Sequence, residues 1–136
     1  MGKILRDLRN IMKYFLPPLL LFIFGWLFYL AGSFSYISWL DNILHFTGGM
    51  ILGFTYFLIL RYFESREYLK LNRFFMIFFV IALVSLTVVL WEFYQFLLGF
   101  FTNIPVQLTL EDTLFDLFLG LLGGLVSIIF IGSRRY

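Results

Sequence analysis

The sequence predicts an all-α integral membrane protein, a four-helix transmembrane bundle with both termini in the cytoplasm. Hydrophobic residues make up 62% of the chain and charged residues 13%, whereas soluble domains contain roughly 45–50% apolar and 25% charged residues. The apolar residues fall in four long runs, and a membrane core of about 30 Å is crossed by about 20 helical residues. The chain therefore reads as one transmembrane domain over residues 1–136, without a separate soluble domain.

Each apolar run predicts one helix. The first helix covers about 15–31, where Pro17 and Pro18 fit the opening turn because its amides lack partners anyway. The other three helices cover about 42–60, 74–100 and 113–132. Because basic residues precede the first run, a cleaved signal peptide is the alternative for it. Its length and its many aromatic residues favour a retained helix.

All ten Lys and Arg residues fall on one side of this topology. They are Lys3, Arg6, Arg9, Lys13, Arg61, Arg66, Lys70, Arg73, Arg134 and Arg135. Because cytoplasmic loops are enriched in Lys and Arg, both termini are predicted in the cytoplasm. We therefore expect a multi-pass protein of the cell membrane. Asp7, Glu64 and Glu67 lie among these bases and are expected to be solvated surface charges.

The other acidic residues and the only histidine are predicted at the opposite, outer end of the bundle. They are Asp41, His45, Glu92, Glu111, Asp112 and Asp116. Residues three or four apart share one face of a helix. Asp41 and His45 therefore lie above Gly49 and Gly53 on the second helix, and the fourth helix repeats this pattern. The corresponding residues of the fourth helix are Asp112, Asp116, Gly120, Gly123 and Ser127.

The glycine stripes predict the packing of the bundle. Glycines let membrane helices approach closely, so the second and fourth helices are expected to pack through them. The polar residues on the same stripes then point inward. The sequence thus predicts an acidic cup, open to the outer surface, formed by Asp41, His45, Glu92, Gln95, Asp112 and Asp116.

Simpler roles stay open for several of these residues. Asp41 and Asp112 stand where helices are predicted to start, and Asp is a preferred helix cap. His45 can be an interfacial histidine with satisfied hydrogen bonds. Glu111 is expected to be a loop charge, and Gln95 a hydrogen-bonding support.

The residue types of the cup suit a divalent cation. One imidazole with several carboxylates can bind Mg, Mn or Zn, and the same groups can perform acid–base catalysis. The predicted metal ligands are His45, Glu92, Asp112 and Asp116. The predicted catalytic residues are Glu92, Asp116 and His45. The predicted substrate-binding residues are Asp41, Gln95 and Asp112.

The outer end has no Lys or Arg, so phosphoryl chemistry there would need a metal to supply positive charge. The absence of cysteine excludes thiolate sites.

Three motifs resemble a known family. They are Asp41-x-x-x-His45, Glu92-x-x-Gln95 and Asp112-x-x-x-Asp116-x-x-x-Gly120. Over about 40–125 the chain resembles the VanZ-like small membrane proteins and the YjdF-like inner-membrane proteins, and the segments Trp91–Gln95 and Asp112–Asp116 are closest to the YjdF-like form. The resemblance implies a cell-envelope context, since the named member of the VanZ-like family is associated with glycopeptide resistance.

Three kinds of function are compatible with these observations. The favoured one is a cup that binds a divalent cation or a polar lipid or cell-envelope headgroup, with metal-assisted catalysis left open. The alternatives are a small oligomeric ion-coupled transporter and a structural or assembly subunit. Carriers place their coupling sites near the membrane midplane, which disfavours the transporter. The lipid bilayer is the expected partner and nucleic acid is not, while the sequence leaves the oligomeric state open.

Overall fold

The computed structural model describes residues 2–30, 39–102 and 109–133 of the chain. Within these residues it contains helices α1 (Gly2–Met12), η1 (Lys13–Phe15), α2 (Leu16–Leu30), α3 (Trp39–Ser65), α4 (Arg73–Thr102) and α5 (Leu110–Ser133). Four helical segments are long and apolar enough to cross a membrane: Leu5–Leu30, Trp39–Ser65, Arg73–Phe101 and Leu110–Ile131. The predicted all-α class with four spans is confirmed.

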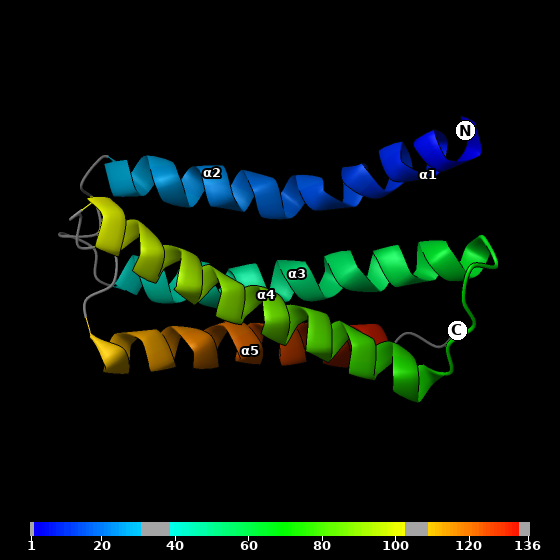
Figure 1. Cartoon of the computed structure of the whole chain (residues 1–136). Coiled ribbons are helices and arrows are strands. Elements are labelled where there is room, and N and C mark those ends of the chain that lie inside the picture. Colours follow the sequence, from blue (N-terminus) through cyan, green and yellow to red (C-terminus); the bar gives the residue numbers. More distant parts are fainter. Residues whose placement is uncertain (1, 31–38, 103–108, 134–136) are drawn as a thin grey trace.

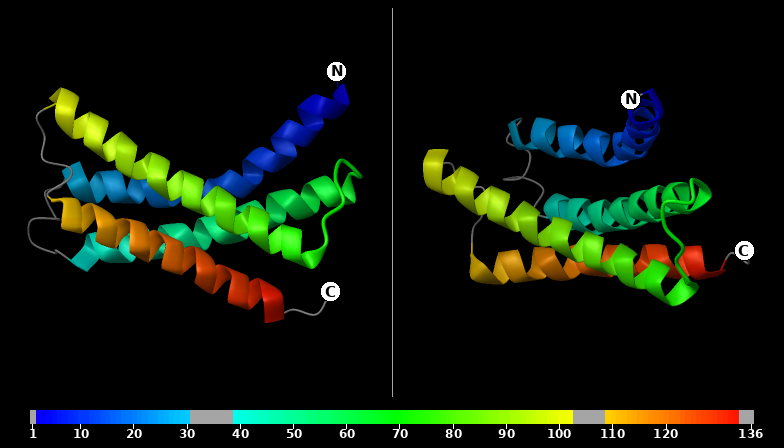
Figure 2. Two further views of the ribbon diagram at one scale, coloured as in Figure 1. Left: turned by 60° about the horizontal axis from the view of Figure 1, so that its bottom comes forward. Right: turned by 45° about the vertical axis from the view of Figure 1, so that its right-hand side comes forward.

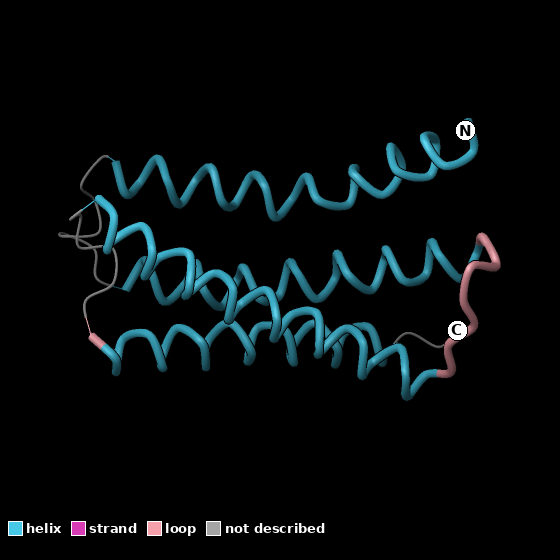
Figure 3. The backbone as a smooth tube through the Cα atoms, in the orientation of Figure 1, coloured by secondary structure: helices cyan, strands magenta, loops and turns pink. Residues whose placement is uncertain are grey.

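The two ends of the bundle differ in what they carry (Figure 1). At the end that we call the terminal end, α1 begins, α5 finishes and the 66–72 loop joins α3 to α4 (Figure 3). At the distal end, α3 and α5 begin, so these two helices run parallel. The basic residues up to Arg73 belong to elements at the terminal end, whereas Arg134 and Arg135 lie outside the described residues. The predicted cytoplasmic position of this end remains a prediction.

The glycine-mediated packing of the second and fourth spans is confirmed as the contact between α3 and α5. A Cβ atom added at Gly49 would overlap the carbonyl oxygen of Gly120, and one at Gly123 would overlap that of Phe46. At Gly53 it would overlap the hydroxyl of Ser127. Because membrane helices gain little from the hydrophobic effect, such backbone proximity supplies the dispersion contacts that hold them together. These two helices form the most extensive contact in the described structure.

Helix α4 covers this pair diagonally (Figure 1) and provides the centre of the core. Val80, Val84 and Val88 are buried, with 1%, 1% and 5% of their surface exposed. Their spacing of four residues puts them on one face of the helix. Val88 packs into the space left by Gly120 and Val84 into that left by Gly124, where an added Cβ would come within 2.8 and 2.7 Å. The small residues of α5 therefore accommodate α4 as well as α3.

The first span packs more loosely. Helix α2 contacts α3 on the side away from α5 (Figures 1 and 2), and none of its residues is buried in the described structure. Its predicted range of 15–31 agrees with Leu16–Leu30 within the described residues. The basic segment before it was not predicted to be helical, yet it forms α1.

The other three helices extend beyond the predicted ranges. Helix α3, predicted over 42–60, continues at its end through the polar stretch Arg61–Ser65. Hydropathy marks the part of a helix that lies in lipid, whereas a helix ends where its backbone hydrogen bonding stops. For α4, Asn72 marks the start, because its side chain accepts a hydrogen bond from the amide of Phe75 at 3.0 Å.

Candidate functional site

Three polar residues from three helices meet inside the distal half of the bundle. His45 of α3, Glu92 of α4 and Asp116 of α5 expose only 9%, 5% and 4% of their surfaces. His45 and Asp116 each lie six residues after the first residue of their helix, which places both about 9 Å from the helix start. The predicted convergence of these residues is present in the structure.

The imidazole of His45 lies at the centre of this group. Its Nε2 atom is 3.6 Å from Oδ1 of Asp41 and 3.7 Å from Oδ2 of Asp116. Its Nδ1 atom is 3.6 Å from Oε1 of Glu92. One ring nitrogen therefore faces two carboxylates and the other faces a third. We call these four residues the distal acid–histidine site.

These distances distinguish two kinds of contact. Direct N–H···O hydrogen bonds span about 2.7–3.2 Å, so the histidine contacts are too long to be such bonds. Two donors bound about 2.1 Å from one tetrahedral ion lie about 3.4 Å apart. Ligand atoms of Asp41, His45 and Asp116 all lie within 4.8 Å of one another. This spacing allows the three residues to act as donors to one shared cation.

Glu92 has a different position from the other carboxylates. It was predicted as a metal ligand, and this stays a prediction; the three residues whose possible ligand atoms lie within 4.8 Å of one another are Asp41, His45 and Asp116. Glu92 instead faces the Nδ1 side of the imidazole. Metal-binding histidines commonly donate their second ring N–H to a carboxylate, which fixes the orientation of the ring. Glu92 occupies the place of such an orienting partner.

The remaining predicted residues surround this group. Asp41 is partly exposed and forms the rim of the site, while Gln95 and Asp112 are half-buried outside the group of three. Asp112 does not cap α5, because Thr109 does so by accepting a hydrogen bond from the amide of Asp112 at 3.1 Å. Capping therefore does not explain Asp112. Asp41 lies within the first turn of α3.

The site is rich in acidic groups and poor in basic ones. Three carboxylates surround one imidazole, and the sequence has no Lys or Arg between Lys13 and Arg61 or between Arg73 and Arg134. Burying uncompensated charge within a membrane costs several kcal/mol. The N-terminal ends of α3 and α5 point their positive dipoles toward this region, but each contributes only about half a unit charge. A protonated imidazole balances one carboxylate, so the other acids either carry protons or face a cation.

One buried oxygen supports the same conclusion. Among the described residues, Oδ1 of Asp116 is fully buried and has no hydrogen-bond partner. Its other oxygen, Oδ2, faces His45. Buried carboxylate oxygens are almost always satisfied by hydrogen bonds or by a cation. The Oδ1 atom of Asp116 therefore lacks the hydrogen bond or cation that a buried carboxylate oxygen normally has.

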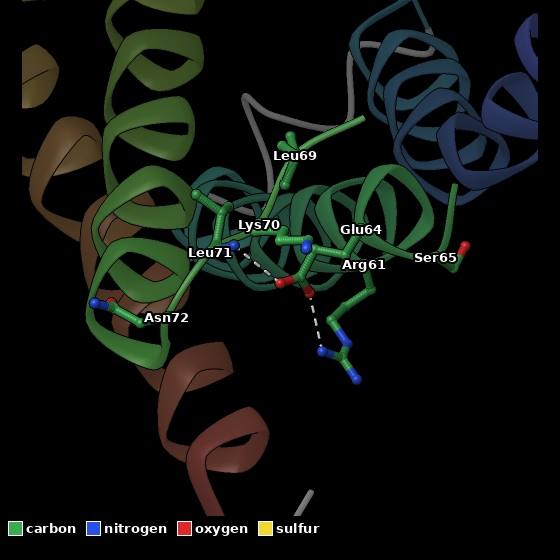
Figure 4. Close-up of a pocket in the computed structure, with 7 residues that line it drawn as sticks. All are labelled: Arg61, Glu64, Ser65, Leu69, Lys70, Leu71 and Asn72. Carbon is green, nitrogen blue, oxygen red and sulfur yellow. Dashed lines mark hydrogen bonds and ion pairs between the residues drawn. The ribbon is translucent and has the colours of Figure 1, made fainter. Parts of the chain in front are cut away.

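An open groove at the terminal end has no comparable chemistry. It is lined by Arg61, Glu64, Ser65, Leu69, Lys70, Leu71 and Asn72 (Figure 4). Its only acid, Glu64, accepts hydrogen bonds from the guanidinium of Arg61 at 2.9 Å and from the amide of Leu71 at 3.2 Å. The carboxylate is already neutralised there, so the groove does not compete with the distal site as a cation site.

A second polar cluster lies at the terminal end, and sequence reasoning missed it. Asp7 was expected to be a solvated charge, but only 5% of its surface is exposed. Its carboxylate accepts hydrogen bonds from Tyr62 and Tyr68, both at 2.6 Å, and from Arg66 at 2.7 Å. The signal that could have revealed this cluster is the helical spacing of Tyr62 and Arg66 at the end of α3.

Comparison with known proteins gives one family. Residues 6–135 match the model of the family described as "Predicted membrane protein (DUF2238)". No curated protein and no solved structure matches the chain. The family description agrees with the four apolar helices of the structure. The chain belongs to the DUF2238 family of predicted membrane proteins.

Proposed function

We propose that the protein binds a divalent cation at the distal acid–histidine site. The observation that carries this proposal is the group of ligand atoms from Asp41, His45 and Asp116, all within 4.8 Å of one another and gathered from two helices. The long histidine–carboxylate distances and the buried Oδ1 of Asp116 support it independently. One imidazole with two carboxylates suits Zn or Mn better than Mg, which prefers oxygen ligands and retains several waters.

Such a cation would keep a coordination position for an external ligand. Three protein ligands with a fourth open position are typical of catalytic zinc sites, whereas structural sites are closed by four protein ligands. Asp41 is partly exposed at the rim, so an oxygen of a polar lipid or cell-envelope headgroup can approach from this side. The motif resemblance to the VanZ-like and YjdF-like proteins supports the same cell-envelope setting.

The proposal includes an orientation in the membrane. The one-sided distribution of Lys and Arg supports a multi-pass cell-membrane protein with both termini in the cytoplasm. The distal site then opens toward the outer surface. Because the chain lacks cysteine, a single cysteine introduced at Glu111 tests this arrangement. A membrane-impermeant maleimide applied to intact cells should label it, and labelling only after lysis would refute the orientation.

The experiment for cation binding uses the full chain, purified without a histidine tag and freed of metal. Calorimetric titration with Zn²⁺ or Mn²⁺ should give one saturable site per chain. The variant Asp116→Asn should bind more than about 100-fold more weakly, because even outer partners of metal ligands contribute about 10–100-fold to affinity. The control is Glu111→Gln, since Glu111 is exposed on the same helix. It should bind like the wild type.

Two results would contradict this proposal. The first is an unmodified protein without saturable binding of any divalent cation tested. The second is an Asp116→Asn variant with unchanged affinity. A variant that only unfolds more easily, in a protein that binds no metal, would support the alternative in which the polar residues hold the helices together.

A further inference from the structure

Helix α1 exposes an apolar stripe. Leu5, Leu8 and Met12 expose 61%, 52% and 71% of their surfaces. Their spacing of three and four residues places them on one face of the helix. The stripe faces away from the rest of the protein, so no described part of the chain shields it from water. A contiguous exposed apolar face of this kind usually contacts lipid or a partner.

A basic stripe runs beside the apolar one. Arg6, Arg9 and Lys13 have the same spacing of three and four residues and are all exposed. Successive helical residues differ by about 100° in direction, so Arg9 points to a different side from Leu8. A helix with one apolar face and one basic face is typical of helices that lie in the interface of an anionic bilayer.

The third side of α1 is fixed to the terminal end of α3. Asp7 accepts hydrogen bonds from Tyr62, Arg66 and Tyr68. The bond to Asp7 raises the pKa of Tyr68 above its ordinary value, so the phenol keeps its proton far above neutral pH. Glu67, between Arg66 and Tyr68, has a φ of 60°, a conformation that costs free energy in a non-glycine residue. This turn brings both neighbours onto Asp7.

The attachment determines which faces of α1 stay outside. Asn10, one turn from Asp7, donates a hydrogen bond to the hydroxyl of Tyr62 at 3.3 Å. With Asp7 and Asn10 held against α3, the helix cannot rotate to bury its apolar stripe in the bundle. Both the apolar and the basic stripe are therefore presented outward in a fixed orientation.

The length of the first span places α1 at the membrane surface. The segment Leu5–Leu30 has 26 residues, or about 39 Å of helix, which exceeds a hydrocarbon core of about 30 Å. The excess lies at the N-terminal end, where the charged residues are. The short 3₁₀ helix Lys13–Phe15 separates α1 from α2, and the two helices differ in direction (Figure 2).

We propose that α1 is a membrane-surface helix that binds anionic phospholipids of the leaflet at the terminal end. Leu5, Leu8 and Met12 lie against the acyl chains, and Arg6 and Arg9 contact the lipid phosphates. The charge complementarity between the basic stripe and anionic headgroups identifies this partner. Binding at this end is independent of the cation site at the distal end.

The first test measures how deep the two stripes lie. Because the chain has no cysteine, Leu8→Cys and Arg9→Cys each give one attachment point for a nitroxide label. In vesicles with phosphatidylglycerol, the label at position 8 should be relaxed by oxygen and protected from an aqueous nickel reagent. The label at position 9 should show the opposite preference. Three results would overturn the proposal: both labels accessible to nickel only, both accessible to oxygen only, or both protected because a second copy covers them.

The second test measures lipid selectivity. The double variant Arg6→Gln/Arg9→Gln should lose about five-fold of its preference for phosphatidylglycerol over phosphatidylcholine per residue changed. Competition with spin-labelled lipids in reconstituted full-length protein provides the measurement. The matched control Lys70→Gln/Arg73→Gln removes the same charge from the terminal end but leaves α1 intact, and it should keep the preference. An equal loss in both variants, or no loss in the first, would contradict the role of α1.

Discussion

The glycine contact between α3 and α5 gives a prediction whose size follows from the structure. In Gly49→Ala the added Cβ would overlap the carbonyl oxygen of Gly120 and lie 2.7 Å from its carbonyl carbon. Ordinary carbon contacts are about 3.5–4.0 Å, so the two helices must separate by at least about 1 Å. The added Cβ is attached to the backbone of α3 and the carbonyl group belongs to the backbone of α5. Because both helix backbones are rigid, neither group can move aside cheaply. Overpacking of this kind costs about 1–3 kcal/mol.

The neighbouring residue provides the matched control. A Cβ added at Gly48 would meet only the Cδ2 atom of Leu21, at 3.5 Å. This is an ordinary contact with the end of a flexible side chain, so Gly48→Ala should change stability by no more than about 0.5 kcal/mol. Both variants make the same chemical change and have the same effect on helix propensity. Their difference therefore isolates the helix–helix contact.

The assay is reversible unfolding of the full-length protein in mixed micelles, followed by near-ultraviolet circular dichroism. Gly49→Ala should unfold at lower denaturant than Gly48→Ala. It should also bind the cation more weakly, because an added separation of about 1 Å would move His45 on α3 away from Asp116 on α5, beyond their present 3.7 Å. Two donors about 2.1 Å from one tetrahedral ion lie about 3.4 Å apart, so this separation would take the pair further from that spacing. Equal stability of the two variants would refute the reasoning.

Three further predictions concern single polar groups. Glu92→Gln should weaken cation binding about 10–100-fold without abolishing it, as expected for a residue that orients His45, and calorimetry checks this. Tyr56→Phe removes the hydrogen bond to Thr87 and should lower the free energy of unfolding by only about 0.6 kcal/mol, the average for such bonds in membranes, in the same unfolding assay. Asp7→Asn should lower the thermal unfolding midpoint and speed proteolysis of α1, because three donors lose a charged acceptor.

The sequence predicted the four spans and the glycine contact between α3 and α5 well, because both depend on simple periodicities. Long apolar runs leave few alternatives to transmembrane helices, and the four-residue spacing of Gly49 and Gly53 predicted the face that contacts α5. The same stripe predicted that His45 points inward, and the structure buries it. The direction of a residue around a helix is thus readable from spacing alone.

The distribution of contacts within the site was not predictable in the same way. Spacing placed Glu92, Asp112 and Asp116 near His45, but it does not determine side-chain rotamers or the rotation of α4 against α3. The structure puts Glu92 on Nδ1 and Asp41 beside Nε2. The predicted ligand set contained Glu92 and Asp112, whereas the group of close ligand atoms contains Asp41 with His45 and Asp116. The sequence gives no distances between side chains.

The polar cluster around Asp7 at the terminal end was not predicted, for another reason. Asp7 lies among basic residues, a context that normally indicates a solvated charge. Its burial depends on Tyr62 and Tyr68, more than fifty residues away in the sequence, and on the turn at Glu67. The amphipathic spacing of α1 was present in the sequence, but a basic segment before an apolar run is also typical of an ordinary cytoplasmic flank.

X-ray absorption at the zinc edge tests the cation site most directly, on full-length untagged protein loaded with one Zn²⁺ per chain. His45 is the only histidine of the chain, so an imidazole signal can come from this residue alone. The proposed site predicts one imidazole nitrogen and carboxylate oxygens at about 2.0–2.2 Å from the metal, with fewer oxygens in Asp116→Asn. A first shell without imidazole, or a spectrum unchanged by Asp116→Asn, would show that the distal acid–histidine site does not hold the ion.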